Sequence, residues 1–313
     1  MNRNTQAVFG AMLAGSLALL LVCALPENRL SPDALQETVP ETVPETLPAP
    51  LPETLPATLS ETAPVPAKKV NILLIGRDSS ALPARSDAMI LCTFDPVEKS
   101  LTLTSLLRDL WIDIPGHGQD RINAAYAYGG RALLDETIES AFDIPIHGNV
   151  EVDFDSFAAL TDLLGGVDLE LRKDEAREIS RVTGTPLEEG LQHLSGPQAL
   201  AFARIRKLDP DGDFSRTERQ RRLLCAMASA GRALNAGELM VLAREALPLV
   251  ETDFSLKEIL ALSGTVLPIM DNGTVRSQHV PQNYFDRIIR GMAVLEADRA
   301  ETAAFLQRTA GCR

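Results

Sequence analysis

The residues best suited to chemistry in this chain are the arginines of segment 201–222, AFARIRKLDPDGDFSRTERQRR. Two of them, Arg204 and Arg206, end one predicted helix. In the next helix, Arg219 and Gln220 follow Arg216 by three and four positions, so these three polar residues share one face. A guanidinium group is a planar fork that binds phosphate oxygens in pairs, and several together favour a multiply charged phosphate. The pattern therefore predicts an anion site.

A solvated basic helix face is the alternative explanation of this cluster. The chain as a whole is acidic, with a formal net charge of −13, yet six of the seven basic residues in the segment are arginine. This excess of arginine in an acidic protein favours the anion site. The opposite face of the second helix carries Leu223, Leu224 and Met227 and is expected to pack inward.

Two carboxylates form a second group of candidate site residues. Asp78 follows the first predicted strand, and Asp87 lies just before the next one. Residues at such strand ends gather at one edge of an α/β sheet, where ligands bind. Two carboxylates beside a pyrophosphate suit Mg²⁺, which prefers oxygen ligands. Capping of turns is an equally good explanation of two aspartates at these positions.

The sequence lacks the patterns typical of several other functions. The acidic balance and an aromatic content of 4% argue against binding of nucleic acid. The chain has no phosphate-binding Gly-Xaa4-Gly-Lys-Ser/Thr loop, no Gly-Xaa-Ser-Xaa-Gly elbow and no ligand spacing for zinc. A calcium loop that starts at Asp209 would need Gly and Glu at the positions of Phe214 and Gln220.

The N-terminal part is predicted to lie outside the fold. Residues 7–25 carry no charge, and 19 residues at about 1.5 Å each span roughly 28 Å, close to the thickness of a bilayer core. We expect a single membrane anchor with residues 1–6 as a short tail inside the cell and the rest of the chain outside. A cleaved signal peptide is the alternative, and a lipoprotein modified at Cys23 is less favoured because Val22 precedes it.

Residues 26–69 repeat the unit Glu-Thr-Xaa-Pro. Proline at this density blocks helix and sheet, so this segment is predicted to be a disordered, extended stalk. Residues 70–313 form the globular body.

The body is predicted to be an α/β domain with a central mixed sheet and helices on both faces. The expected strands are 70–75, 88–94, 101–106, 110–114, 150–154 and 167–171, with two weak strand patterns from about 275. The expected helices are 131–142, 155–164, 196–204, 214–233, 236–248, 255–266 and 296–308.

These motifs together resemble the LytR–CpsA–Psr family of membrane-anchored envelope proteins. The resemblance runs from about residue 70 to residue 228. It rests on NILLIGRD (71–78), RSDAMIL (85–91), SLLRDLWIDIPGHGQDRINAAYAYGG (105–130), DFDSFAALTDLLGGVDL (153–169) and ALAFARIRKLDPDGDFSRTERQ (199–220). The chain departs from the usual family pattern at Leu107, where the family often has proline. The resemblance implies a single α/β/α sandwich domain that is catalytic and extracytoplasmic.

The resemblance also implies residue roles. Asp78 and Asp87 match ligands of Mg²⁺, or of Mn²⁺ in its place. The residues that match the pyrophosphate-binding set are Arg85, Arg108, Arg121, Arg204, Arg206, Arg216, Arg219 and Gln220. The residues with implied catalytic roles are Arg108, Asp109, Arg204 and Arg206, and Asp87 or Asp109 is expected to accept a proton.

The implied reaction transfers a glycopolymer from a polyprenyl-pyrophosphate carrier to peptidoglycan and forms a phosphodiester. A hydrolytic pyrophosphatase that uses the same residues is one alternative. A non-catalytic protein that binds lipid or regulates the envelope is another. The implied partners are the lipid-linked glycan, peptidoglycan and the membrane, with no nucleic acid.

The cysteines allow one further expectation. A disulfide can persist outside the membrane, and we predict a bridge between Cys225 in the long helix and Cys312 near the C-terminus. Cys92 lies in an apolar strand and is predicted to be a buried free thiol.

Overall fold

The fold is described by a computed structural model that covers residues 68–77, 86–206, 208, 213–234, 236–255, 258, 262, 266, 269 and 273–311. The predicted anchor, the stalk up to residue 67, Asp78, Arg85 and Cys312 lie outside the described residues. The backbone of Asp87 is described but its side chain is not. None of the helices in the described ranges has the length and apolar character needed to cross a membrane.

A mixed sheet forms the centre of the fold. Within the described residues it has six strands in the order β10–β3–β2–β1–β6–β9. Their bounds are β1 Val70–Arg77, β2 Ser86–Asp95, β3 Ser100–Leu106, β6 Gly148–Val152, β9 Glu251–Thr252 and β10 Thr274–Val280. Every residue of β1 and β3 is buried, because helices cover both faces and leave neither strand a solvated side.

The pairing directions bring four strand ends to one edge. β1 pairs antiparallel with β2, which pairs antiparallel with β3, so β1 and β3 run the same way. β6 lies parallel to β1, and β10 lies parallel to β3. The C-terminal ends of β1, β3, β6 and β10 therefore share one edge, which we call the C-terminal edge.

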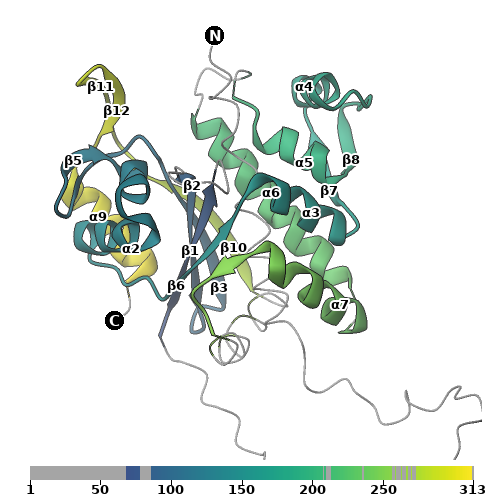
Figure 1. Cartoon of the computed structure of the whole chain (residues 1–313), viewed down its shortest axis with the longest axis horizontal. Coiled ribbons are helices and arrows are strands. Elements are labelled where there is room, and N and C mark those ends of the chain that lie inside the picture. Colours follow the sequence, from purple (N-terminus) through teal and green to yellow (C-terminus); the bar gives the residue numbers. More distant parts are fainter. Residues whose placement is uncertain are drawn as a thin grey trace, which may run out of the picture.

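Helices pack on both faces of the sheet, as predicted (Figure 1). One layer contains α2 (Ile122–Phe142) and α9 (Arg299–Ala310), and the Asn71 side chain donates to the Ala310 carbonyl at 2.8 Å. The other layer contains α3 (Phe154–Leu163), α5 (Gly196–Ala203), α6 (Asp213–Ala233) and α7 (Ala236–Ala246). The predicted helix 255–266 lies largely outside the described residues.

Two predicted strands exist but pair outside the central sheet. β4 (Trp111–Ile114) forms a hairpin with β5 (Gly118–Arg121), and β7 (Val167–Leu171) pairs with β8 (Gly190–Leu194). A third two-stranded sheet, β11 (Phe285–Ile289) with β12 (Met292–Glu296), means that three strands rather than two follow residue 273 in the described part of the chain.

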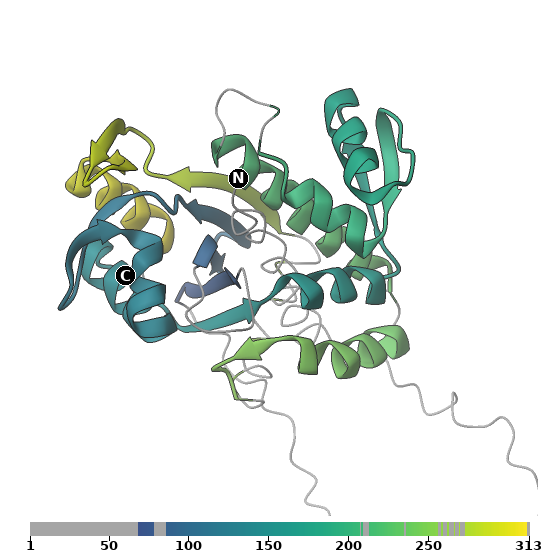
Figure 2. The ribbon, with the colours of Figure 1, turned by 45° about the horizontal axis from the view of Figure 1, so that its top comes forward.

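Two elements of the fold, α4 (Lys173–Thr183) and β8, were not predicted. Helix α4 connects β7 to β8, and the three elements form what we call the β7–α4–β8 arm. It lies beside α5 and α6, on the side of the molecule away from α2 and α9 (Figure 1, Figure 2). The prediction of helix 131–142 was too short, since α2 begins at Ile122 and bends at Gly129 and Gly130. Gly130 has a φ of 65°, which side chains rarely tolerate.

The cysteine predictions are partly tested. Cys92 is buried in β2 and has no disulfide partner among the described residues, as predicted. Cys225 is exposed on α6. Because Cys312 lies outside the described residues, the Cys225–Cys312 bridge stays a prediction.

A polar cluster lies beneath α2. Asn149 on β6 donates from Nδ2 to Asp135 Oδ2 at 2.6 Å, and its backbone N–H donates to Asp253 Oδ1 at 2.7 Å. Burial raises the pKa of the Asp135 carboxyl to about 7, and the charges of Asp253, Glu139 and Glu151 act in the same direction. Asp135 therefore binds its proton more tightly in the folded state than in the unfolded state.

This shift predicts a pH-dependent stability. The contribution of Asp135 is complete below its ordinary pKa of 3.8 and is lost as the pH rises through about 7. An Asp135→Asn variant should gain in free energy of unfolding relative to wild type between pH 5 and pH 8. Urea unfolding across this range measures the difference. Glu136→Gln, on the exposed side of the same helix, serves as the control. A difference for Asp135→Asn that does not change with pH would contradict the assignment.

Candidate functional site

The arginine face of α6 is buried. Arg216, Arg219 and Gln220 are 1%, 2% and 1% exposed. The solvated basic face is therefore the wrong explanation for these residues. The opposite face of α6 packs inward as predicted, with Leu223 and Met227 fully buried. Both faces of this helix are covered because the β7–α4–β8 arm packs against it.

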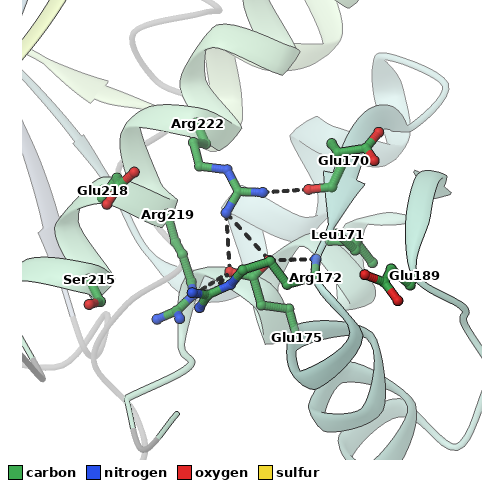
Figure 3. Close-up of a pocket in the computed structure, with 9 residues that line it drawn as sticks. All are labelled: Glu170, Leu171, Arg172, Glu175, Glu189, Ser215, Glu218, Arg219 and Arg222. Carbon is green, nitrogen blue, oxygen red and sulfur yellow. Dashed lines mark hydrogen bonds and ion pairs between the residues drawn. The ribbon is translucent and has the colours of Figure 1, made fainter. Parts of the chain in front are cut away.

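Glu175 on α4 meets the arginines of α6. Its Oε1 accepts from Arg219 Nε at 2.8 Å and from Arg222 Nη1 at 3.1 Å (Figure 3). Arg172, which precedes α4, places its Nη2 3.4 Å from the same oxygen. Gln220 differs from these residues, since neither polar atom of its buried amide has a hydrogen-bond partner among the described residues.

Arg204 and Arg206 follow α5 and extend the cluster towards the sheet. The guanidinium carbon of Arg204 lies 5.1 Å from the ring centre of Phe154, the first residue of α3. Burial lowers the pKa of Arg204, but an arginine keeps its charge at any physiological pH. The carbonyl of Ile205 lies 3.5 Å from Arg219 Nη1. The structure therefore places Arg219 against the segment that carries Arg204 and Arg206.

The register of the central sheet relates the position of this arginine cluster to that of the predicted carboxylates. Gly76 of β1 lies opposite Val152 of β6, so the two strands reach the C-terminal edge in register, and Phe154 follows β6 there. Across β1, Arg77 lies opposite Ser86, which precedes Asp87. The backbone thus places Arg77 and Ser86, the neighbours of Asp78 and Asp87 in the sequence, at the C-terminal edge, and the ring of Phe154 brings Arg204 near it.

The donors near Asp87 suit a hard cation. Ser86 Oγ is buried and has no hydrogen-bond partner among the described residues. Hydroxyl and carboxylate oxygens are the ligands that Mg²⁺ prefers. In the described part of the chain, no group of three or more His, Cys, Asp or Glu side chains could hold a metal.

A third set of predicted residues follows β3 at the same edge. Asp109 accepts from Arg108 Nε at 3.4 Å through Oδ2 and from Arg121 Nη1 at 3.1 Å through Oδ1. All three side chains are about one-fifth exposed. Backbone bonds hold the turn in place, since Leu295 N–H donates to the Asp109 carbonyl at 2.8 Å. Arg108 and Arg121 are therefore a pair that one carboxylate orients.

The sequence was compared with known protein families and with individual proteins. Residues 53–311 match the LytR_cpsA_psr family. The chain belongs to this family. TagV of Bacillus subtilis (strain 168), a polyisoprenyl-teichoic acid–peptidoglycan teichoic acid transferase, is 35% identical over 204 residues, which make up 62% of this chain and 52% of TagV. The chain thus matches about half the length of this relative.

Solved structures of the family have the same fold. TagT bound to LIIa-WTA has a TM-score of 0.66 and 28% identity, over 81% of this chain and 95% of that one. The family protein YwtF (TagT) with bound octaprenyl pyrophosphate lipid has a TM-score of 0.62 and 27% identity, with the same coverage. The predicted mixed α/β fold is therefore confirmed.

The sequence did not indicate two buried networks of this family member. Arg221 donates from Nη1 to Ser105 Oγ at 2.6 Å and from Nε to Ser277 Oγ at 2.5 Å, which ties α6 to β3 and β10. The sequence signal for this network was weak, because a serine in a strand does not indicate which distant side chain it will contact.

The second network lies at the end of β1. Tyr126 of α2 donates to Glu151 Oε2 at 2.5 Å, and Arg77 Nε lies 3.6 Å from the same oxygen. Arg77 also donates to Glu251 at 2.6 Å. Burial raises the pKa of Tyr126, and the hydrogen bond to Glu151 acts in the same direction, so the hydroxyl keeps its proton. Because Arg77 directly precedes Asp78, this network supports the C-terminal edge.

Removal of the Tyr126 hydroxyl tests the second network. A buried hydrogen bond to a charged group contributes about 1.5–3 kcal/mol, so Tyr126→Phe should lower the free energy of unfolding by about that amount. The matched control is Tyr128→Phe on the same helix, whose exposed hydroxyl donates to Asp120 and should contribute less. Chemical denaturation measures both variants. An equal decrease in the free energy of unfolding of both variants would show that the buried Tyr126 hydroxyl contributes no more than the exposed one.

Proposed function

We propose that the chain is a phosphotransferase that moves a glycan phosphate from a polyprenyl-pyrophosphate carrier to peptidoglycan. The observation that carries the proposal is the set of buried arginines on α6, beside the segment that carries Arg204 and Arg206. Charges that water does not screen act strongly on an anion. The names of the TagV relative and of the lipid-bound YwtF (TagT) structure support this choice of substrates.

In the proposed reaction a sugar hydroxyl of the acceptor attacks the phosphorus nearer the glycan. A bond forms between the acceptor oxygen and this phosphorus, and the bond from phosphorus to the bridging oxygen breaks. Polyprenyl phosphate leaves with the electron pair, and the hydroxyl proton passes to Asp87 or Asp109. The arginines bind the pyrophosphate and stabilise the charge that develops on its oxygens.

We assign the arginines to two groups. Arg204, Arg206, Arg216 and Arg219, with the Gln220 amide, bind the pyrophosphate from the side of α6. Arg108 and Arg121, oriented by Asp109, approach from the side of β3, and we assign Arg85, which directly precedes β2 in the sequence, to the same group. An anion held from two sides is fixed in position, which promotes reaction with a bound acceptor.

We further propose that Asp78 and Asp87 hold a Mg²⁺ ion, or Mn²⁺ in its place. The pairing of Arg77 with Ser86 supports this, since these residues directly precede Asp78 and Asp87 in the sequence, and the buried Ser86 Oγ is a further oxygen without a hydrogen-bond partner among the described residues. When bound, such an ion supplies positive charge to the pyrophosphate oxygens.

We also propose that residues 7–25 anchor the chain in the cell membrane, with residues 1–6 inside. The proline-rich segment 26–69 then serves as a stalk for the extracytoplasmic catalytic domain, residues 70–313. This arrangement keeps the arginine cluster close to carriers whose lipid tails lie in the membrane.

Arginine variants test the proposed transfer. Arg204→Ala and Arg206→Ala should each reduce transfer by about 10³-fold, because such arginines stabilise the transition state. Their unfolding midpoints should stay near that of wild type. Arg244→Ala, on the exposed surface of α7, is the matched control. Transfer of labelled glycan to peptidoglycan measures activity, and mass spectrometry of lipid that copurifies with the protein identifies the carrier. Near-normal transfer by both variants would refute the assignment, and release of the glycan without acceptor would indicate a hydrolase.

Removal of divalent metal tests the proposed ion. Chelation should abolish transfer by the wild type, and added Mg²⁺ should restore it. Mg²⁺ should also raise the unfolding midpoint of the wild type but not of Asp87→Asn, because a ligand stabilises the state that binds it. Full transfer in the presence of chelator, with no change of midpoint on adding Mg²⁺, would contradict the proposal.

A further inference from the structure

Glu175 occupies an unusual position for a carboxylate. It lies on the first turn of α4 and is 0% exposed. The other acidic residues that line the adjoining pocket, Glu170, Glu189 and Glu218, are exposed. Burial of an ionised carboxylate is costly unless charged partners and hydrogen bonds compensate for the lost water. Its surroundings must therefore provide that compensation.

Within the described residues, three arginines and one backbone group meet Glu175. Oε1 accepts from Arg219 Nε at 2.8 Å and Arg222 Nη1 at 3.1 Å, and Arg172 Nη2 lies 3.4 Å away. Oε2 accepts from the Arg172 backbone N–H at 3.0 Å. Figure 3 shows these guanidinium groups converging on the one carboxylate at the wall of the pocket.

The hydrogen bond to Nε has a geometric consequence for Arg219. A guanidinium group is planar, so a bond at Nε fixes the direction in which the Nη side of the fork points. On that side Arg219 Nη1 lies 3.5 Å from the carbonyl of Ile205, between Arg204 and Arg206. Glu175 thus aligns the head of Arg219 with the segment that carries the other two arginines.

We infer that Glu175 is a positioning residue for pyrophosphate binding, and that it acts through Arg219. The inference rests on the proposed function. The β7–α4–β8 arm then has a defined task, since it carries a carboxylate from outside the central sheet to the buried face of α6. Glu175 does not itself contact the substrate.

A role of Glu175 in charge balance alone and a role in positioning Arg219 predict opposite changes in anion affinity, which makes the inference testable. Loss of a negative charge near an anion site should strengthen the binding of an anion. Loss of orientation should weaken it, because Arg219 would no longer be held beside Ile205. The direction of the change in affinity therefore separates a residue that positions Arg219 from one that only balances charge.

The experiment measures binding of octaprenyl pyrophosphate to the full chain in detergent. Glu175→Gln should weaken binding about tenfold, and Arg219→Ala should weaken it at least as much. The double variant should bind as Arg219→Ala does, because Glu175 acts through that arginine. Glu178→Gln, on the same helix and paired with Arg181 at the surface, is the matched control and should bind as wild type does.

Several results would overturn the inference. Unchanged or tighter binding by Glu175→Gln would do so, and so would losses that add in the double variant. If Glu175→Gln fails to fold, Glu175→Asp takes its place in the same cycle. Aspartate keeps the charge but is shorter by one methylene, so wild-type binding by that variant would overturn the inference as well. Absence of binding by the wild type would instead refute the proposed function, and the inference with it.

Discussion

The burial of arginine side chains is the constraint on which the rest of this structure depends. An arginine cannot escape its charge by releasing a proton, so each buried guanidinium needs acceptors or a ring face. The fold provides a different solution for each of three arginines, Arg204, Arg219 and Arg221. Glu175 serves Arg219, the serines of β3 and β10 serve Arg221, and the ring of Phe154 serves Arg204. These solutions tie α6 to the sheet on one side and to the β7–α4–β8 arm on the other.

This dependence explains why the candidate site lies where it does. The parallel pairs β1–β6 and β3–β10 end at one edge, where Arg108 lies two positions after β3 and Phe154 two positions after β6. The Asp109 pair with Arg108 and Arg121 stands at the end of β3, and α6 approaches from the opposite layer. Several arginines therefore lie near this edge in a protein whose net charge is negative.

The helices and strands that depend on local sequence patterns were predicted well. β1, β2 and β3 are apolar runs bounded by turns, and α3, α5 and α6 carry regular apolar spacing, so all six were predicted within a few residues. Helix α4 was missed because its sequence, KDEAREISRVT, offers few apolar residues, and only Ala176 and Ile179 are buried apolar positions. Its clearest signal is the acidic first turn, which also contains Glu175.

Long-range pairing was beyond the reach of sequence patterns. The spacing of Arg216, Arg219 and Gln220 correctly placed them on one face, but it could not show that a second element covers that face. In the same way, the predicted strand 70–75 ended next to Arg77, but no local pattern indicates its partners Glu151 and Glu251, which are 74 and 174 positions away. The roles of Asp78, Arg85 and Asp87 remain predictions, because their side chains lie outside the described residues.

The pairing of Glu175 with α6 also constrains how this chain can change over evolution. Glu175 lies 44 positions before Arg219 and 47 before Arg222, yet the three side chains form one charged unit. A substitution that removes the carboxylate leaves buried cations, and one that removes the arginines leaves a buried anion. Either intermediate is less stable than both end states. These positions should therefore vary together among relatives that keep the β7–α4–β8 arm, and drift independently in those that have lost it.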